Sequence, residues 1–428
     1  MQELYLKRQQ QADYFEVFSD CETCYFRQRR ALLFKVVNKK IASIEFKGPE
    51  LIAPYARQCC SFTLRIYQQE VELYGLFFPA YTQLLFEYLE DLLENLYNQL
   101  RPKIIKLIVI ETLAELCEVL SSEFLDLKKS LPFVSFNATI RQLIQDVQSR
   151  LIFRAQIFII KDIVNFKPTP EDLDYPAKLT TGDRYDQWCK PLQKTLAFLA
   201  TIYRCVDYVI FRGLASEAIS ACLSCLQNLS DLLAQKSELD ACLFLLAHLL
   251  LLKEQLTPFD IGSTWQRESI AETEITDQEE PASYDLLQLF TRDGPLVPVP
   301  FSLPKEKVEQ HFEVAYEAFL QFSVKYFTEF LRDSVEKNSL NKFSAEESLK
   351  SFRCPCLAEL QAKNKLFCER LHLYLGEVKE EQELYAVVKK KVLDGYQIFC
   401  QNNLSNFDFS ELYNSIPRIL IYDKKIYD

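Results

Sequence analysis

The sequence is poor in glycine, with 8 in 428 residues, or about 2% against a usual value of about 7%. So few glycines leave little provision for tight β-hairpin turns or for the close backbone approach that binds a phosphate. The composition therefore argues against Rossmann, P-loop and multi-hairpin β architectures. It favours helices.

Positive charge and long hydrophobic runs are also scarce. The chain carries 49 Lys and Arg against 60 Asp and Glu, a net charge of -11. Nucleic-acid binding needs a positive field that displaces counterions, so no nucleic-acid partner is expected. The longest apolar run, Ala241 to Leu252, is about half of the ~20 residues needed to cross a bilayer, and His248 interrupts it. No transmembrane span is expected.

The 14 cysteines are the first candidates for chemistry. Most of them fall in apolar helical stretches and no basic-then-apolar signal segment opens the chain, so they are interpreted as reduced thiols of a cytosolic protein. Two CxxC pairs and one CPC pair each supply part of a zinc spacing: Cys21 with Cys24, Cys222 with Cys225, and Cys354 with Cys356. A structural zinc site needs four converging ligands. Neither a metal nor a cofactor is therefore expected.

Histidines are few as well. His248, His311 and His372 are the three, and none lies in an HExxH spacing or beside a GxSxG turn. His248, in a leucine-rich helix, is expected to be a hydrogen-bonded core residue. Acidic pairs at helical spacing, such as Glu111 with Glu115, are typical of a solvated face. No catalytic residue is predicted, although an all-helical enzyme with a site built from distant residues stays open.

Apolar periodicity predicts long helices. Between Tyr81 and Leu100 the leucines and tyrosines recur with a period near 3.6, and acidic residues take the other face. Pro102 then suits the first turn of a new helix, which is expected to run from Lys103 to about Leu127. Ile104, Ile105 and Ile108 are assigned to the apolar side of that helix. The predicted fold is all-α, an elongated rod of consecutive helical bundles.

Proline positions and composition shifts divide the chain into five parts. Prolines interrupt any helix in one stretch, and acidic residues followed by prolines mark another. The expected parts are one or more helical bundles (1–160), a Pro-rich ordered connector (161–186), a bundle (187–260), an acidic then Pro-rich linker (261–304), and a C-terminal bundle (305–428) with a polar loop near 334–352.

One positive cluster is the candidate docking patch. It consists of Arg27, Arg29, Arg30, Lys35, Lys39 and Lys40. Such a cluster can dock on anionic lipid or on an acidic partner, and each basic residue near an anionic surface contributes about 1 kcal/mol. The alternative is an ordinary solvated helix face. Neutralising the three arginines is expected to leave folding intact.

The connector carries a resemblance. Its stretch QIFIIKDIVNFKPTPEDLDYPAKL, from Gln156 to Leu179, resembles the family of subunit 3 of the conserved oligomeric Golgi complex. Four further stretches are similar to the same family in the same order, the first of them more weakly: CCSFTLRIYQQEVELYGLFF (59–78), RPKIIKLIVIETLAELC (101–117), IYRCVDYVIFRGLASEAISAC (202–222) and CLFLLAHLLLLKEQLTPFD (242–260). These stretches span about Cys59 to Asp260.

The resemblance implies a non-enzymatic subunit of a vesicle-tethering complex with the helical-rod (CATCHR-like) architecture. Such a subunit acts in retrograde intra-Golgi transport as a peripheral protein on the cytosolic face of the Golgi membrane. The implied partners are other subunits of the complex, SNAREs, Rab-type small GTPases and golgin coiled coils. Family members begin with a long coiled-coil region, so this chain is expected to match their C-terminal half. A helical scaffold of another tether, of the exocyst kind, is the alternative.

Overall fold

Every regular element in the described part of the chain is helical, which confirms the all-α prediction. The structure is a computed structural model. It describes residues 12–125, 131–180, 184–257, 304–339, 345–376, 378–403 and 416–422.

Contacts divide the chain into two compact units. Unit 1 consists of Met1–Phe158 and Phe198–Leu214, and unit 2 of Ile159–Ala197 and Ala215–Asp428. The five-part division expected from the sequence stays a prediction. Its acidic and Pro-rich linker (261–304) lies outside the described residues, apart from Pro304, where a helix begins.

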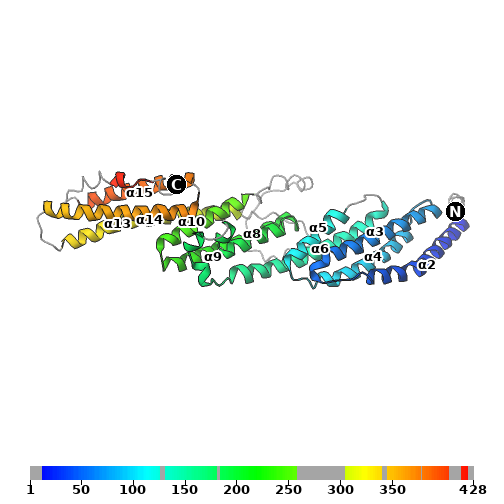
Figure 1. Cartoon of the computed structure of the whole chain (residues 1–428). Coiled ribbons are helices and arrows are strands. Elements are labelled where there is room, and N and C mark those ends of the chain that lie inside the picture. Colours follow the sequence, from blue (N-terminus) through cyan, green and yellow to red (C-terminus); the bar gives the residue numbers. More distant parts are fainter. Residues whose placement is uncertain are drawn as a thin grey trace. The chain divides into compact units, whose positions relative to one another are not determined.

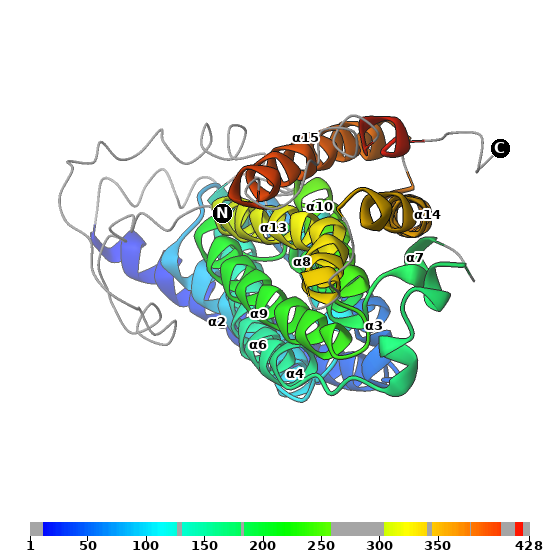
Figure 2. The ribbon, with the colours of Figure 1, turned by 90° about the vertical axis from the view of Figure 1, so that its left-hand side faces the viewer.

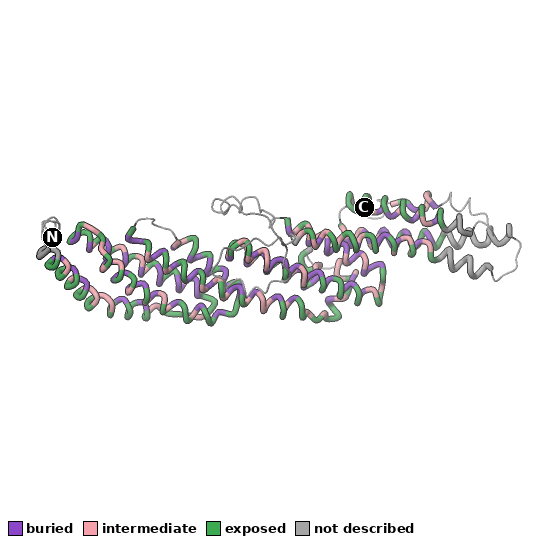
Figure 3. Tube along the Cα trace, turned by 180° about the vertical axis from the view of Figure 1, so that it is seen from behind, coloured by how far each residue is buried: buried purple, intermediate pink, exposed green. Residues whose placement is uncertain are grey.

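Unit 1 is built on α4, which packs against α2, α3 and α6 (Figure 1). The helices are α2 (Ala12–Ala42), α3 (Ile52–Phe77), α4 (Gln83–Ile104), α5 (Ile110–Val119) and α6 (Val134–Phe158), with short turns at η1 (Pro49–Leu51), η2 (Leu120–Phe124) and η3 (Leu131–Phe133). On α4, Leu85, Leu89, Leu92 and Leu96 have no exposed surface. Figure 3 shows buried and exposed positions alternating along these helices. The predicted apolar stripe is confirmed.

Helix α3 runs antiparallel to both of its neighbours. Arg29 of α2 meets Glu70 near the end of α3, and Lys103 at the end of α4 lies 5.0 Å from the ring centroid of Tyr55 near the start of α3. Short links between antiparallel helices produce this pairing. As a result, the C-terminal ends of α2 and α4 and the N-terminal end of α3 lie together.

The predicted helix start at Pro102 is wrong. Helix α4 continues through Pro102 to Ile104, and α5 begins only at Ile110. Ile104 is 1% exposed, so α4 continues two residues past the proline and buries this side chain against the bundle. The chain leaves the helix at 105–109. Ile105 and Ile108, expected on the apolar side, are therefore exposed (50% and 60%).

Unit 2 is centred on α13, which packs against α10 and α15 (Figure 2). Its helices, two of which share residues with unit 1, are α7 (Arg184–Gln187), α8 (Lys190–Ile202), α9 (Tyr208–Ala234), α10 (Glu238–Gln255), α13 (Pro304–Ser339), α14 (Ala345–Leu375) and α15 (Val378–Asn403). The polar loop expected near 334–352 is instead helical up to Ser339 and again from Ala345. That stretch is polar but has no Gly or Pro, and its Glu and Lys residues are good helix formers.

The connector is held by local polar contacts. It contains η4 (Ile159–Val164), η5 (Pro170–Leu173) and η6 (Ala177–Thr180). Thr169 and Asp172 form a reciprocal capping box, and Lys190 Nζ lies 2.9 Å from Asp172 Oδ1. Burial raises the pKa of Asp172, but the Lys190 ammonium and the Thr169 donors outweigh it and hold this pKa below its usual value. Asp172 therefore acts as a charged anchor for the connector.

Two helical glycines are expected to respond oppositely to alanine. A Cβ at Gly395 of α15 would lie 2.7 Å from Cγ1 of Val324, whereas nothing lies within 4 Å of a Cβ at Gly75 of α3. Alanine gains up to about 1 kcal/mol of helix propensity at either site, and overpacking costs about 1–3 kcal/mol. We expect Gly75→Ala to raise the thermal midpoint of unfolding and Gly395→Ala to lower it. Equal shifts of the same sign would contradict the packing of α13 on α15.

Candidate interaction surface on helix α2

Helix α2 carries the predicted docking patch, and its buried face fixes which patch residues point outward. Two groups of residues are buried at intervals of four, the first being Phe18, Glu22 and Phe26 and the second Val37 and Ile41. Tyr74 donates to the Glu22 carboxylate at 2.6 Å, and Thr82 also donates to it. Burial, with a further contribution from Glu22, raises the pKa of Tyr74. This face holds α2 against α3 and α4.

Two arginines of the predicted patch are used inside unit 1. Arg29 holds the buried Glu70 with two hydrogen bonds, of which the Nε bond is 3.0 Å, and Tyr88 donates to the same carboxylate at 2.9 Å. Arg30 contacts Asp91 at 2.6 Å, with both side chains nearly half exposed. For Arg29 the structure gives reason to expect a cost to folding on neutralisation, because its removal leaves a buried carboxylate uncompensated.

The remaining four residues of the patch are exposed. Arg27, Lys35, Lys39 and Lys40 lie on the outer side of α2. Two large apolar side chains accompany them, Leu32 (63% exposed) and Val36 (61% exposed). Leu32 and Val36 are four residues apart, so they lie one above the other on the same helix face. We call these six residues the α2 face.

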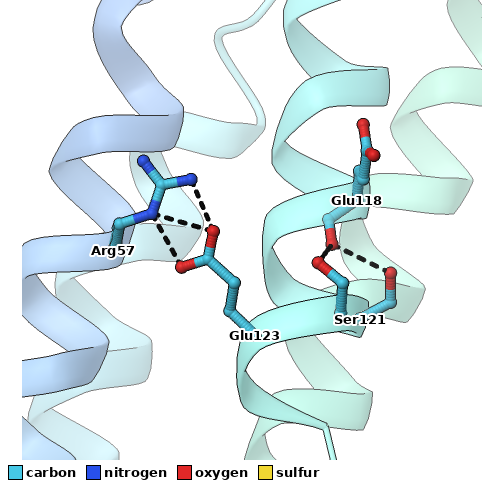
Figure 4. Close-up of polar contacts among 5 residues, drawn as sticks. Arg57, Glu118, Ser121 and Glu123 are labelled. Carbon is cyan, nitrogen blue, oxygen red and sulfur yellow. Dashed lines mark hydrogen bonds and ion pairs between the residues drawn. The ribbon is translucent and has the colours of Figure 1, made fainter.

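Other surface cations differ from those of the α2 face because they form ion pairs with carboxylates of the same unit. Figure 4 shows Arg57 of α3 bound to Glu123 of η2, the turn that follows α5, with nitrogen to oxygen distances of 2.5 to 2.9 Å. The Arg57 guanidinium holds the pKa of Glu123 below its usual value. In the same view Ser121 donates to the carbonyl oxygen of Glu118. The Arg57 side chain thus joins two helical segments of unit 1.

The apolar half of the α2 face was missed in the sequence, although Leu32 and Val36 at a spacing of four were a signal for it. The carboxylates that engage Arg29 and Arg30 gave no such signal. Glu70 and Asp91 lie 41 and 61 positions further along the chain, so their proximity depends on the packing of three helices.

The cysteine pairs lie on helices. Cys21 and Cys24 are exposed on α2, and Cys222 and Cys225 are buried on α9. Cys225 Sγ donates to the carbonyl oxygen of Ile163 at 3.0 Å. No group of three or more His, Cys, Asp or Glu that could hold a metal is found among the described residues. The side chains of the third pair, at 354 and 356, lie outside them.

His248 is a hydrogen-bonded core residue, as predicted. It is 4% exposed, its Nε2 accepts from the backbone N–H of Cys189 at 3.1 Å, and its Nδ1 lies 2.8 Å from the carbonyl oxygen of Phe244. Because Nε2 accepts, the proton of the neutral ring lies on Nδ1. Both ring nitrogens have hydrogen-bond partners, and the bond to Cys189 joins α10 to the residue that directly precedes α8.

One helix, α9 (Tyr208–Ala234), is long and apolar enough to cross a membrane by length and composition alone. More than half of its most apolar stretch is buried inside the protein, and core helices of bundles pass the same test. The sequence-based expectation on membrane spans stays a prediction.

Comparison with known proteins decides the family. The family model of conserved oligomeric Golgi complex subunit 3, C-terminal, matches residues 1–272. The chain belongs to this family. The human protein named conserved oligomeric Golgi complex subunit 3 is 28% identical over 418 aligned positions, covering 81% of this chain and 50% of the relative. The Drosophila melanogaster protein of that name is 29% identical, covering 64% and 36%.

The match extends to fungi. The subunit 3 of Schizosaccharomyces pombe is 23% identical, over 90% of this chain and 54% of the relative. The chain thus spans about half the length of the curated relatives it matches. No solved structure matches it. The resemblance found in the sequence is confirmed, and the alternative of an exocyst-like tether is not supported.

Proposed function

We propose that the chain is a non-enzymatic subunit of a Golgi vesicle-tethering complex that acts in retrograde intra-Golgi transport by binding other proteins. Family membership over residues 1–272 carries this proposal. The two helical units support it, because bundles with exposed helix faces bind other helices by packing.

The proposed partners are other subunits of the same complex, SNAREs, Rab-type GTPases and golgin coiled coils. All but the GTPases offer long helices, which suit docking along a helix face. Membrane association is proposed to be indirect and peripheral, on the cytosolic side of the Golgi. The chemistry required is recognition without turnover.

The α2 face is the proposed contact for this role. Burying Leu32 and Val36 against a partner would remove apolar surface from water, the main source of affinity at an interface. The four cations around them would select and orient an acidic partner surface. Arg29 and Arg30 leave the docking patch, since they hold α2 within unit 1.

A pair of double variants tests this contact. The first double variant combines Leu32→Ser with Val36→Ser, and the second combines Lys35→Glu with Lys39→Glu. Each is expected to reduce recruitment of the fluorescent chain to the Golgi. The helical circular dichroism should stay unchanged, because all four side chains are exposed. Leu76→Ser is the matched control, since Leu76 is an apolar side chain that is 81% exposed on α3, a different helix. Recruitment equal to that of the control in both double variants would exclude the α2 face as the contact.

A further inference from the structure

A second exposed surface of unit 1 lies where the chain leaves α4. The turn 105–109 carries Ile105, Ile108 and Val109, exposed by 50%, 60% and 46%, and Phe153 of α6 is 51% exposed. Solitary exposed apolar side chains are normal, but apolar groups gathered around one turn mark an interaction site. Arg150 and Arg154 of α6 reach the same turn. We call these six residues the turn surface.

The two arginines are fixed by the backbone of the turn. Arg150 Nε donates to the carbonyl oxygen of Leu107 at 2.9 Å, and Arg154 Nε donates to that of Ile108 at 2.8 Å. The Arg150 guanidinium also lies 5.4 Å from the ring centroid of Phe153. These contacts orient each guanidinium and involve only its Nε donor. The terminal amino groups, four N–H donors on each arginine, are not used by these bonds.

Three other arginines of unit 1 are used differently. Arg29, Arg30 and Arg57 each bind a carboxylate of the same unit. Within the described part of the chain, neither Arg150 nor Arg154 has a carboxylate within ion-pair distance. A guanidinium that is already oriented loses less side-chain entropy when a carboxylate binds, and it offers that carboxylate a bidentate fork.

We propose that the turn surface binds an acidic amphipathic helix of a partner protein. Arg150 and Arg154 are four residues apart on α6, which places them about 6 Å apart along one face, the spacing of two carboxylates at i and i+4 on a partner helix. The apolar residues of the turn and Phe153 would cover the apolar stripe of that helix. The proposal deepens the proposed function, since it gives the chemistry of one partner.

A partner helix fits this surface better than an anionic membrane does. Glu111, Glu115 and Glu118 are exposed on α5, which begins directly after the turn, and the whole chain has a net charge of -11. An anionic bilayer is broad enough to interact with the net negative charge of the whole chain, which it would repel. A single helix is narrow enough to contact the two arginines alone. Local charge complementarity therefore selects the helix.

The test uses the purified full chain and a displayed library of random 20-residue peptides. Peptides that bind are expected to be amphipathic, with Glu or Asp pairs at i, i+4 beside an apolar stripe. Arg150→Glu with Arg154→Glu should weaken their binding at least about tenfold, and Ile108→Ser should also weaken it. The Ile108 variant leaves both arginine bonds in place, so it reports on the surface even if the arginine variant loses stability. Arg65→Glu and Leu76→Ser, at exposed positions on α3, are the matched controls and should bind as the parent does.

Each other outcome overturns the proposal. Selected peptides that lack the acidic pairs, peptides that bind the variants as tightly as the controls, or no enrichment at all would exclude an acidic helix. Vesicles containing phosphatidylserine are the second probe, and binding of the chain to them that is lost in the same variants would assign the surface to a membrane. Because binding is measured with the purified chain and Golgi recruitment in cells, failure here is distinguishable from failure of the proposed function.

Discussion

Replacing Arg29 with methionine is expected to lower the free energy of unfolding of unit 1 by about 3 kcal/mol, whereas the same change at Arg30 should cost less than about 1 kcal/mol. The carboxylate partners differ in burial. The Glu70 side chain is 5% exposed, while that of Asp91 is 46% exposed. Without Arg29, the Glu70 charge stays buried with only the Tyr88 hydroxyl to compensate it. Without Arg30, Asp91 is solvated by water.

Hydrogen exchange of peptides from α2, α3 and α4, followed by mass spectrometry, measures this effect in unit 1 alone. Arg29→Met should speed exchange across all three helices, because Arg29 and Glu70 join α2 to α3 and Tyr88 joins them to α4. Adding Glu70→Gln should restore part of the protection by removing the unpaired charge. Equal exchange in the Arg29 and Arg30 variants would show that the buried pair does not hold α2 in place.

Acidification from pH 7 to pH 5 is expected to lower the stability of the α10 region by about 2 kcal/mol through His248 alone. Burial lowers the pKa of His248 to about 4 from an ordinary value of 6.5, although the bond to the Phe244 carbonyl raises it. The unfolded chain therefore binds a proton in this range that the folded chain does not. The stability contributed by neutral His248 is full above pH 6.5 and is lost as pH falls toward 4.

The physical cause is the bond that protonation would break. Nε2 accepts the backbone N–H of Cys189, and a protonated Nε2 cannot accept it. Lys178, a nearby cation, lowers the pKa of His248 further because it repels a second positive charge. His248→Gln keeps a polar side chain of similar reach but cannot titrate. Hydrogen exchange of α10, corrected for intrinsic rates at each pH, should show a steeper loss of protection in the parent chain than in this variant, and parallel losses would contradict the assignment.

Helices were predictable where a local pattern determines them. The leucines of α4 recur along one face, and the structure buries that face. The pattern failed where packing overrides a local rule. Pro102 marked a helix start in the sequence, but the burial of Ile104 extends α4 past it. In the same way, low hydrophobicity near 334–352 predicted a loop, yet the chain is helical up to Ser339 and again from Ala345, because polar residues such as Glu and Lys are good helix formers.

The sequence predicted which cations make up the candidate surface, but it did not predict which of them are bound by carboxylates within the fold. The run from Arg27 to Lys40 shows six cations, but only the packed helices reveal that Glu70 and Asp91 use two of them. The turn surface was hidden for a related reason. Ile105 and Ile108 were assigned to the apolar side of a helix, whereas they lie in a turn whose carbonyl groups accept hydrogen bonds from Arg150 and Arg154 of α6, more than 40 positions further along the chain. Contacts between residues more than 40 positions apart decide both surfaces.

We have proposed that this chain acts as a tethering-complex subunit through protein contacts. Affinity purification of the full chain from cells at near-physiological salt, with every retained protein identified by mass spectrometry, tests it most directly. We expect recovery of other subunits of the conserved oligomeric Golgi complex, with less recovered by the double variants of the α2 face and the same amount by Leu76→Ser. Recovery of no subunit, SNARE or coiled-coil tether, with a metabolite or metal retained instead, would contradict it.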